Sequence, residues 1–135
     1  MSIRKFEELD IWKRTRELTK IIYKISSVPG FSRDWGLRDQ LRRASVSVMS
    51  NIAEGFDSGS RKEFARFLSI SRRSTSEMQS QLYVALDQSY MSQEDFKLIY
   101  KEIEEIRRMI TSFIKYLKGI KKTNSLNSPT RKLIN

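Results

Sequence analysis

Apolar positions recur every three or four residues in four segments of this chain, and that spacing places them on one face of an α-helix. In the first segment, about residues 6–27, these positions include Leu9, Trp12, Leu18, Ile22 and Ile25. The Pro29-Gly30 pair ends this predicted helix because proline lacks an N–H donor and restricts the residue before it. In the loop that follows, Phe31 and Trp35 are predicted to anchor into the core.

The second predicted helix covers about residues 34–54. Its apolar face is formed by Leu37, Leu41, Ala44, Val48 and Ile52. Residues 44–48 also alternate between small or polar and apolar side chains as a β-strand would, but that alternation spans five residues and the helical spacing spans four turns. We therefore expect a helix, with Gly55 in the left-handed position that follows many helix ends.

Two polar caps predict where the third and fourth helices begin. Ser60 followed by Glu63 is a capping box, and Ser92 precedes two acids in a first turn. The third helix is predicted to reach about residue 88, with an inner face of Phe64, Phe67, Leu68, Ser71, Thr75, Met78, Leu82, Ala85 and Leu86. The fourth is predicted to reach about Leu117, with an inner face of Phe96, Ile99, Ile103, Ile106, Ile110, Phe113 and Leu117.

Short connections make successive helices antiparallel, so the sequence predicts an all-α fold: an antiparallel, up-down-up-down four-helix bundle over residues 1–119. Residues 120–135 lose the helical period and are predicted to be a basic, disordered tail. Some apolar residues of the first and fourth helices lie off the main stripe, which favours self-association. They are Ile11, Ile21, Tyr100, Met109 and Ile114.

Composition excludes most catalytic chemistry. The 135 residues include no cysteine and no histidine, which removes disulfides, thiolate nucleophiles, imidazole bases and the common zinc ligands. There is also no glycine-rich phosphate loop or serine-nucleophile motif. We therefore expect no enzyme activity, no metal and no cofactor. With no targeting segment and no apolar stretch long enough to span a bilayer, we expect a cytoplasmic protein without a membrane partner.

The charge balance points to polyanionic partners. Lys and Arg number 26 against 16 acids, a net charge of +10. Arginine can bind phosphate through two parallel hydrogen bonds, so the candidate nucleic-acid-binding residues are Arg42, Arg43, Arg61, Lys62, Arg66, Arg72 and Arg73. The alternative is a solvated helix face with local ion pairs, such as Glu63 with Arg66 or Glu104 with Arg108.

A line of polar residues accompanies the apolar face of the second helix. Gln40, Ser47 and Glu54 follow one another at seven-residue steps, and Asn51 shares a face with Glu54. One interpretation is a polar binding site. The interpretation we favour is a structural hydrogen-bond network that fixes helix register, because no base or metal ligand accompanies these residues. The pattern leaves open whether Asn51 and Glu54 face the core or a subunit interface.

Several motifs together resemble one bacterial four-helix-bundle family, which includes proteins encoded in intervening sequences of 23S rRNA genes. The resemblance covers about residues 6–118 and is carried by the segments 6–12 (FEELDIW), 35–37 (WGL), 40–44 (QLRRA), 50–55 (SNIAEG), 62–64 (KEF) and 67–68 (FL). The sequence departs from the family's pattern at Met49, where proline is common, and at Arg73, where glycine is common. The first departure predicts a straighter second helix and the second a more basic surface.

The resemblance implies a ring-like homopentamer. It also implies a relation to the accessory variability determinant of diversity-generating retroelements, a basic bundle that partners a reverse transcriptase and nucleic acid. Two hypotheses follow. The leading one is a non-enzymatic, oligomeric bundle that binds nucleic acid, RNA rather than DNA, through a basic surface. The alternative is an oligomeric protein-interaction scaffold that docks a partner such as a reverse transcriptase.

Overall fold

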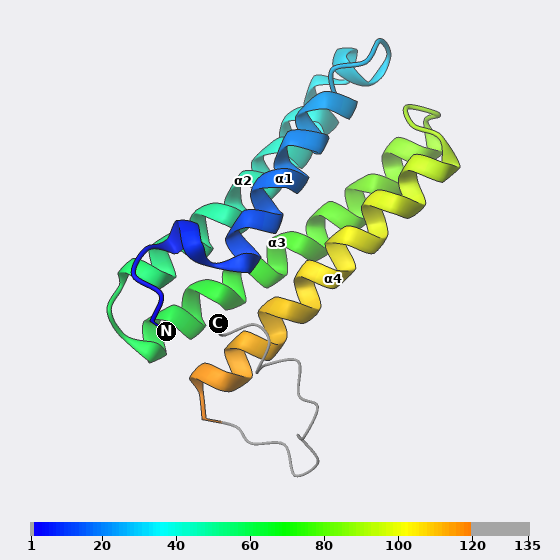
Figure 1. Ribbon diagram of the computed structural model, residues 1–135. Helices are drawn as coiled ribbons and strands as arrows, with labels where there is room; N and C mark the ends of the chain where they lie inside the picture. The colour runs from blue at the N-terminus through cyan, green and yellow to red at the C-terminus, as the bar shows by residue number, and fades with distance from the viewer. Residues whose placement is uncertain (1, 120–135) are drawn as a thin grey trace.

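A computed structural model describes residues 2–119 of the chain, which contain four α-helices and no β-strand (Figure 1). The helices are α1 (Asp10–Ile25), α2 (Trp35–Asp57), α3 (Arg61–Asp87) and α4 (Gln93–Leu117). They alternate in direction along the bundle, so the predicted all-α, up-down-up-down fold is confirmed. Residues 120–135, for which a disordered tail was predicted, lie outside the described residues.

The first helix begins later than its apolar period predicted. Residues Phe6–Glu8 form a separate 3-10 turn, and Leu9 has an extended backbone (φ −74°, ψ 128°) before α1 starts at Asp10. This break keeps Leu9 buried while the chain turns, and it sets the Phe6 ring against Trp12 with ring centroids 5.1 Å apart. Helical spacing alone did not reveal the break because Leu9 lies on the apolar stripe in either conformation.

Side-chain caps begin the other three helices. Asp34 accepts a hydrogen bond from the Leu37 N–H of α2, and Ser60 accepts one from the Glu63 N–H of α3. At the start of α4, Ser92 accepts one from the Asp95 N–H. The hydroxyl half of the predicted capping box is therefore present, but the Glu63 carboxylate accepts hydrogen bonds from Arg66.

The prediction that Gly55 takes the left-handed position after the second helix is wrong. Gly55 lies inside α2, which continues to Asp57, and the glycine with a positive φ after the end of this helix is Gly59 (φ 78°). A Cβ at Gly55 would lie 2.8 Å from both Phe64 Cδ1 and Phe67 Cβ of α3. Glycine is needed here because the backbones of α2 and α3 approach closely, a requirement that a helix-end pattern cannot distinguish from a left-handed cap.

The core is one continuous cluster of buried apolar side chains contributed by all four helices. Among the residues predicted to favour self-association, Ile11 and Ile114 are almost fully buried within this one chain, and Tyr100 and Met109 pack against the core. Only Ile21 is exposed, so most of the apolar surplus is used inside the monomer. Of the two predicted core anchors in the loop, Phe31 is confirmed, because it is buried against Tyr90. The prediction for Trp35 is wrong, because this side chain is 70% exposed and does not enter the core.

Candidate nucleic-acid interface

Arg42 does not present its guanidinium freely, although the sequence grouped it with the phosphate-binding candidates. From α2 it reaches the C-terminal end of α1, where Nε donates to Ser26 Oγ (2.8 Å) and Nη2 donates to Ser27 Oγ (3.0 Å) and to the Tyr23 carbonyl (3.3 Å). Its guanidinium carbon also lies 4.6 Å from the centre of the Tyr23 ring. A cation at a helix C-terminus stabilises the exposed carbonyls and the helix dipole, so Arg42 has a structural role.

Arg61 has the same kind of role at the opposite end of the bundle. From the first turn of α3 it donates to the Tyr116 carbonyl (2.8 Å) and to the Leu117 carbonyl (3.2 Å) at the end of α4. The guanidinium lies 4.9 Å from the centre of the Tyr116 ring. Two of the seven predicted phosphate ligands therefore close helix ends.

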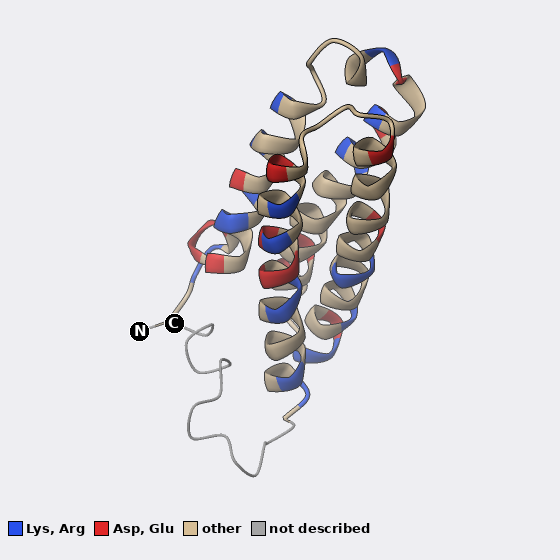
Figure 2. Ribbon diagram, turned by 90° about the vertical axis from the view of Figure 1, so that its right-hand side faces the viewer, with Lys and Arg blue, Asp and Glu red and all other residues tan. Residues whose placement is uncertain are grey.

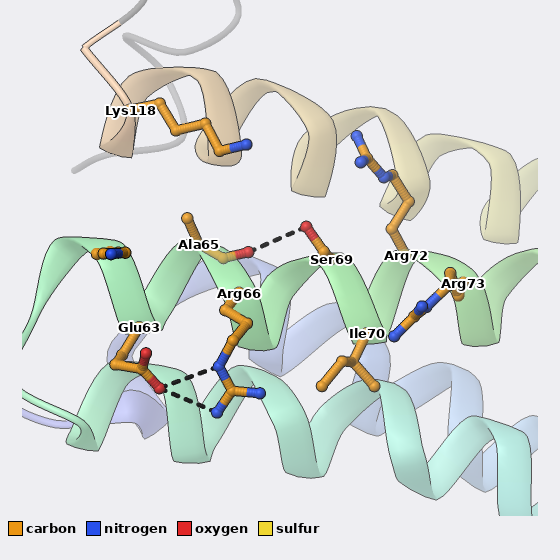
Figure 3. A pocket seen from close by; sticks show the side chains of 9 residues that line it. Glu63, Ala65, Arg66, Ser69, Ile70, Arg72, Arg73 and Lys118 are labelled. Atoms are coloured by element: carbon orange, nitrogen blue, oxygen red, sulfur yellow. Dashed lines mark hydrogen bonds and ion pairs between the residues drawn. The ribbon is translucent and has the colours of Figure 1, made fainter.

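Four of the remaining candidates line one surface hollow of about 730 Å³ between α3 and the end of α4 (Figure 3). They are Lys62, Arg66, Arg72 and Arg73. Lys118, which follows the last turn of α4, lines the hollow from the other side. Figure 3 shows the Lys118 and Arg72 side chains reaching into the space between the two helices, while Arg66 and Arg73 lie along the opposite flank of α3.

A second hollow, of about 480 Å³, continues this surface along α4 and shares Arg72 with the first. Its other cations are Arg107, Arg108 and Lys115. Arg72 makes only a long hydrogen bond, 3.4 Å, to Thr111 Oγ1, so most of its donors remain available at the junction of the two hollows.

We call the charged lining of the two hollows the α3–α4 basic face. It comprises eight cations, Lys62, Arg66, Arg72, Arg73, Arg107, Arg108, Lys115 and Lys118, with two carboxylates, Glu63 and Glu104. Figure 2 looks onto α4, and the half of that helix toward Lys118 carries blue bands without a red one. This concentration of one charge sign creates a strongly positive local potential.

The two carboxylates neutralise only part of the face. Glu63 pairs with Arg66 at 2.9 Å, and Glu104 pairs with Arg107 at 2.9 Å and more distantly with Arg108 at 3.9 Å. A hydrogen bond from Gln79, together with Arg107, lowers the pKa of Glu104, so this carboxylate stays charged at neutral pH. Within residues 2–119, the other five cations of the face have no ion-pair partner.

Half of this face was missed by the sequence prediction. Arg108 was interpreted as a local ion-pair partner of Glu104, and Arg107, Lys115 and Lys118 were not assigned to a site. The Arg108 side chain is 76% exposed and its distance to Glu104 is long, so the predicted i,i+4 pair is weak. The available signal was the absence of any acid in α4 after Glu105. Helical spacing within one segment cannot show that this stretch lies beside Arg72.

Arg43 and the predicted polar line lie elsewhere, along α2. Arg43 is exposed and lines a separate hollow of about 310 Å³ with Gln40, Ser47 and residues of α3. Ser47 accepts hydrogen bonds from Asn51 Nδ2 (3.2 Å) and from Ser74 Oγ of α3 (3.0 Å). These contacts form a small network between two helices.

The rest of the polar line does not join that network. Gln40 and Glu54 are exposed and make no side-chain hydrogen bond with another of the described residues. Asn51, by contrast, is half-buried. The predicted line of four polar residues therefore reduces to Ser47 and Asn51, with Ser74 as a partner that the sequence did not indicate.

Within residues 2–119, no group of three or more acidic side chains comes together to hold a metal ion. Over the same residues, no helix has the length and hydropathy needed to cross a lipid bilayer.

Fold and surface together define a four-helix bundle with one extended basic face. Over residues 7–112 the chain matches the family model described as 23S rRNA-intervening sequence protein. The match covers more than half of the chain, so the chain belongs to this family, and the resemblance seen in the motifs is confirmed. No curated protein matches the chain.

Proposed function

We propose that this protein is a non-enzymatic RNA-binding bundle and that the α3–α4 basic face is its binding surface. One observation carries the proposal: Arg72 joins two hollows that together hold eight cations and two carboxylates. Five of the cations have no acidic partner among the described residues, so phosphates can meet them without first breaking an ion pair. The family's association with 23S rRNA genes makes RNA the nucleic acid to test first.

The binding mechanism is electrostatic. Each lysine or arginine that meets a phosphate releases condensed counterions, so affinity falls as salt rises. If the five unpaired cations each meet one phosphate, the plot of log K against log salt has a slope of roughly −4. Contacts of this kind position the RNA but do not read its sequence.

Self-association would strengthen such binding by repeating the face. Family resemblance suggests a homopentamer, and several copies of one weak phosphate-binding surface on a rigid ring would act together on a long RNA. Light scattering of the purified protein, with and without RNA, measures the number of subunits directly.

The first test is a binding titration with a structured 23S rRNA fragment at two salt concentrations. The test variant is Arg66→Glu with Arg73→Glu, and the matched control is Lys13→Glu with Lys24→Glu on α1. Both variants change the net charge equally, and both control lysines are exposed and outside the face. We expect only the test variant to lose affinity. Equal losses would mean that overall charge, rather than the face, attracts the RNA.

A protein-docking scaffold remains the second candidate, favoured by one observation. Trp35 and Leu98 are large apolar side chains with 70% and 66% exposure, outside the basic face. Partner docking through such residues would survive the Arg66→Glu, Arg73→Glu variant. A protein that ignores RNA at both salt concentrations would leave this second candidate in front.

A further inference from the structure

We infer that the α3–α4 basic face binds the phosphate backbone of double-stranded RNA in preference to single-stranded RNA. The inference rests on the proposed function and specifies which form of RNA the face recognises.

The linings of the two hollows contain no aromatic residue among the described part of the chain. Besides the charged residues, they consist of Ala65, Ser69, Ile70, Thr111 and Ser112. Proteins that bind single-stranded nucleic acid combine a basic groove with exposed aromatic rings, because unpaired bases gain most of their binding energy by stacking. This face offers charge without a stacking platform.

Two rings next to the face, Phe67 and Tyr116, are already covered by arginines. The Arg66 guanidinium lies 4.6 Å from the centre of the Phe67 ring, and Arg61 lies 4.9 Å from the centre of Tyr116. A base stacking on either ring would have to displace an arginine. In the case of Arg61, it would also break two hydrogen bonds to the end of α4.

The exposed aromatic residues lie away from the face. Tyr83 is ten residues beyond Arg73 on α3, roughly 15 Å along the helix, and its ring packs against the Phe96 and Tyr100 rings of α4. Tyr23 is at the C-terminal end of α1 and Trp35 begins α2, at the opposite end of the bundle from Lys118 (Figure 1). None of these three rings lines either hollow of the face.

The charges of the face suit a stiff ligand with two phosphate rows. Lys62 to Arg73 on α3 spans about 16 Å, as does the stretch from Arg107 on α4 to Lys118 just after its end. The two helices run side by side in opposite directions. The two packed helix backbones hold a fixed spacing, and an RNA duplex is already stiff before it binds. A single strand would lose conformational freedom on binding and gain no stacking in return. Duplex RNA is recognised through its shape, phosphates and 2′-hydroxyls, so Ser69 and Thr111 add suitable short polar groups.

The test compares a duplex of roughly 20 base pairs, enough for a typical duplex-binding module, with an unstructured single strand of the same length. Fluorescence anisotropy at low salt should give a dissociation constant at least about fivefold lower for the duplex, per molecule of protein. A single strand that binds as tightly as the duplex, or more tightly, overturns the inference. If neither RNA binds at any salt concentration, the proposed function itself fails, so the two failures are distinguishable.

A second variant tests the reason for the preference. Ile70 lines the first hollow and is half-buried, so Ile70→Trp adds a ring to the face while replacing one apolar side chain with another. The new ring should raise single-strand affinity at least about fivefold by stacking and leave duplex affinity nearly unchanged. An unchanged ratio of the two affinities in a folded Ile70→Trp protein would show that missing aromatic residues do not set the preference.

Discussion

Arginine serves two different purposes in two regions of this bundle. At the C-terminal ends of α1 and α4, Arg42 and Arg61 each donate to backbone carbonyls and lie over a tyrosine ring. On the α3–α4 basic face, Arg72 has one long hydrogen bond and Arg73 has no partner within residues 2–119. The difference is in the acceptors that surround each guanidinium. An arginine whose donors meet protein acceptors stabilises the fold, and one whose donors do not is available for a phosphate.

Arg72→Glu should produce the largest effect because Arg72 belongs to both hollows. The substitution removes a cation and introduces a repelling carboxylate, so RNA affinity should fall roughly tenfold or more at low salt. Anisotropy titrations at several salt concentrations measure the change and should also give a shallower salt dependence. The free energy of unfolding should change by less than about 0.5 kcal/mol, since this side chain makes few contacts. Unchanged affinity would remove Arg72 from the binding surface.

Arg42→Ala should have the opposite pattern of effects, a clear loss of stability with little change in RNA affinity. Losing three hydrogen bonds and the contact with Tyr23 should lower the free energy of unfolding by about 1–2 kcal/mol, measured by urea denaturation. RNA affinity should stay within about twofold under conditions where the protein remains folded, because the end of α1 lies away from the basic face. Arg42→Lys is the informative companion, since lysine keeps the charge but lacks the planar fork that spans the three acceptors. A fully stable lysine variant would contradict the role assigned to the fork.

Glu104→Gln should give a smaller effect on stability that depends on pH. The pKa of Glu104 is lowered in the folded state by the hydrogen bond from Gln79 and by Arg107. Its stabilising contribution is therefore present above the ordinary glutamate pKa and is lost as pH falls through the lowered value. Because the side chain is partly exposed, the loss should be no more than about 0.5 kcal/mol. Urea denaturation at neutral and acid pH should show less acid destabilisation in the variant than in the natural protein.

RNA affinity itself should be almost constant between about pH 6 and 8.5. The chain has no histidine and no cysteine, which are the side chains that ordinarily change charge in this range. Titrations at three pH values and constant ionic strength test this expectation. A marked change across the range would mean that a group outside the basic face controls binding.

Local patterns predicted much of the fold. The Ser60 and Ser92 caps, the helical periods and the end of α4 at Leu117 all follow from spacings within one segment. Predictions failed where the deciding neighbour came from another helix. Gly55 is required by the phenylalanines of α3, and Arg42 finds its acceptors at the end of α1. Helical spacing contains no information about either neighbour.

The same limit explains the incomplete site. Arg66, Arg72 and Arg73 were predicted from their density within one helix and do line a common hollow. Lys115 and Lys118 join them only because α4 runs antiparallel beside α3 in one particular register. The prediction therefore recovered the half of the face that one segment supplies. It also included Arg43, which lies in a different hollow along α2.

The close approach at Gly55 has a consequence for genetics. Any side chain at this position would push against Phe64 and Phe67, and the Arg66 guanidinium lies over the Phe67 ring. A substitution at Gly55 would thus displace the first turns of α3 and the cations that those turns present, although Gly55 itself belongs to neither hollow. An unbiased screen for variants that lose RNA binding would therefore recover substitutions of Gly55 as well as substitutions of the cations. Positions at which substitution abolishes binding would thus include a residue that makes no contact with RNA.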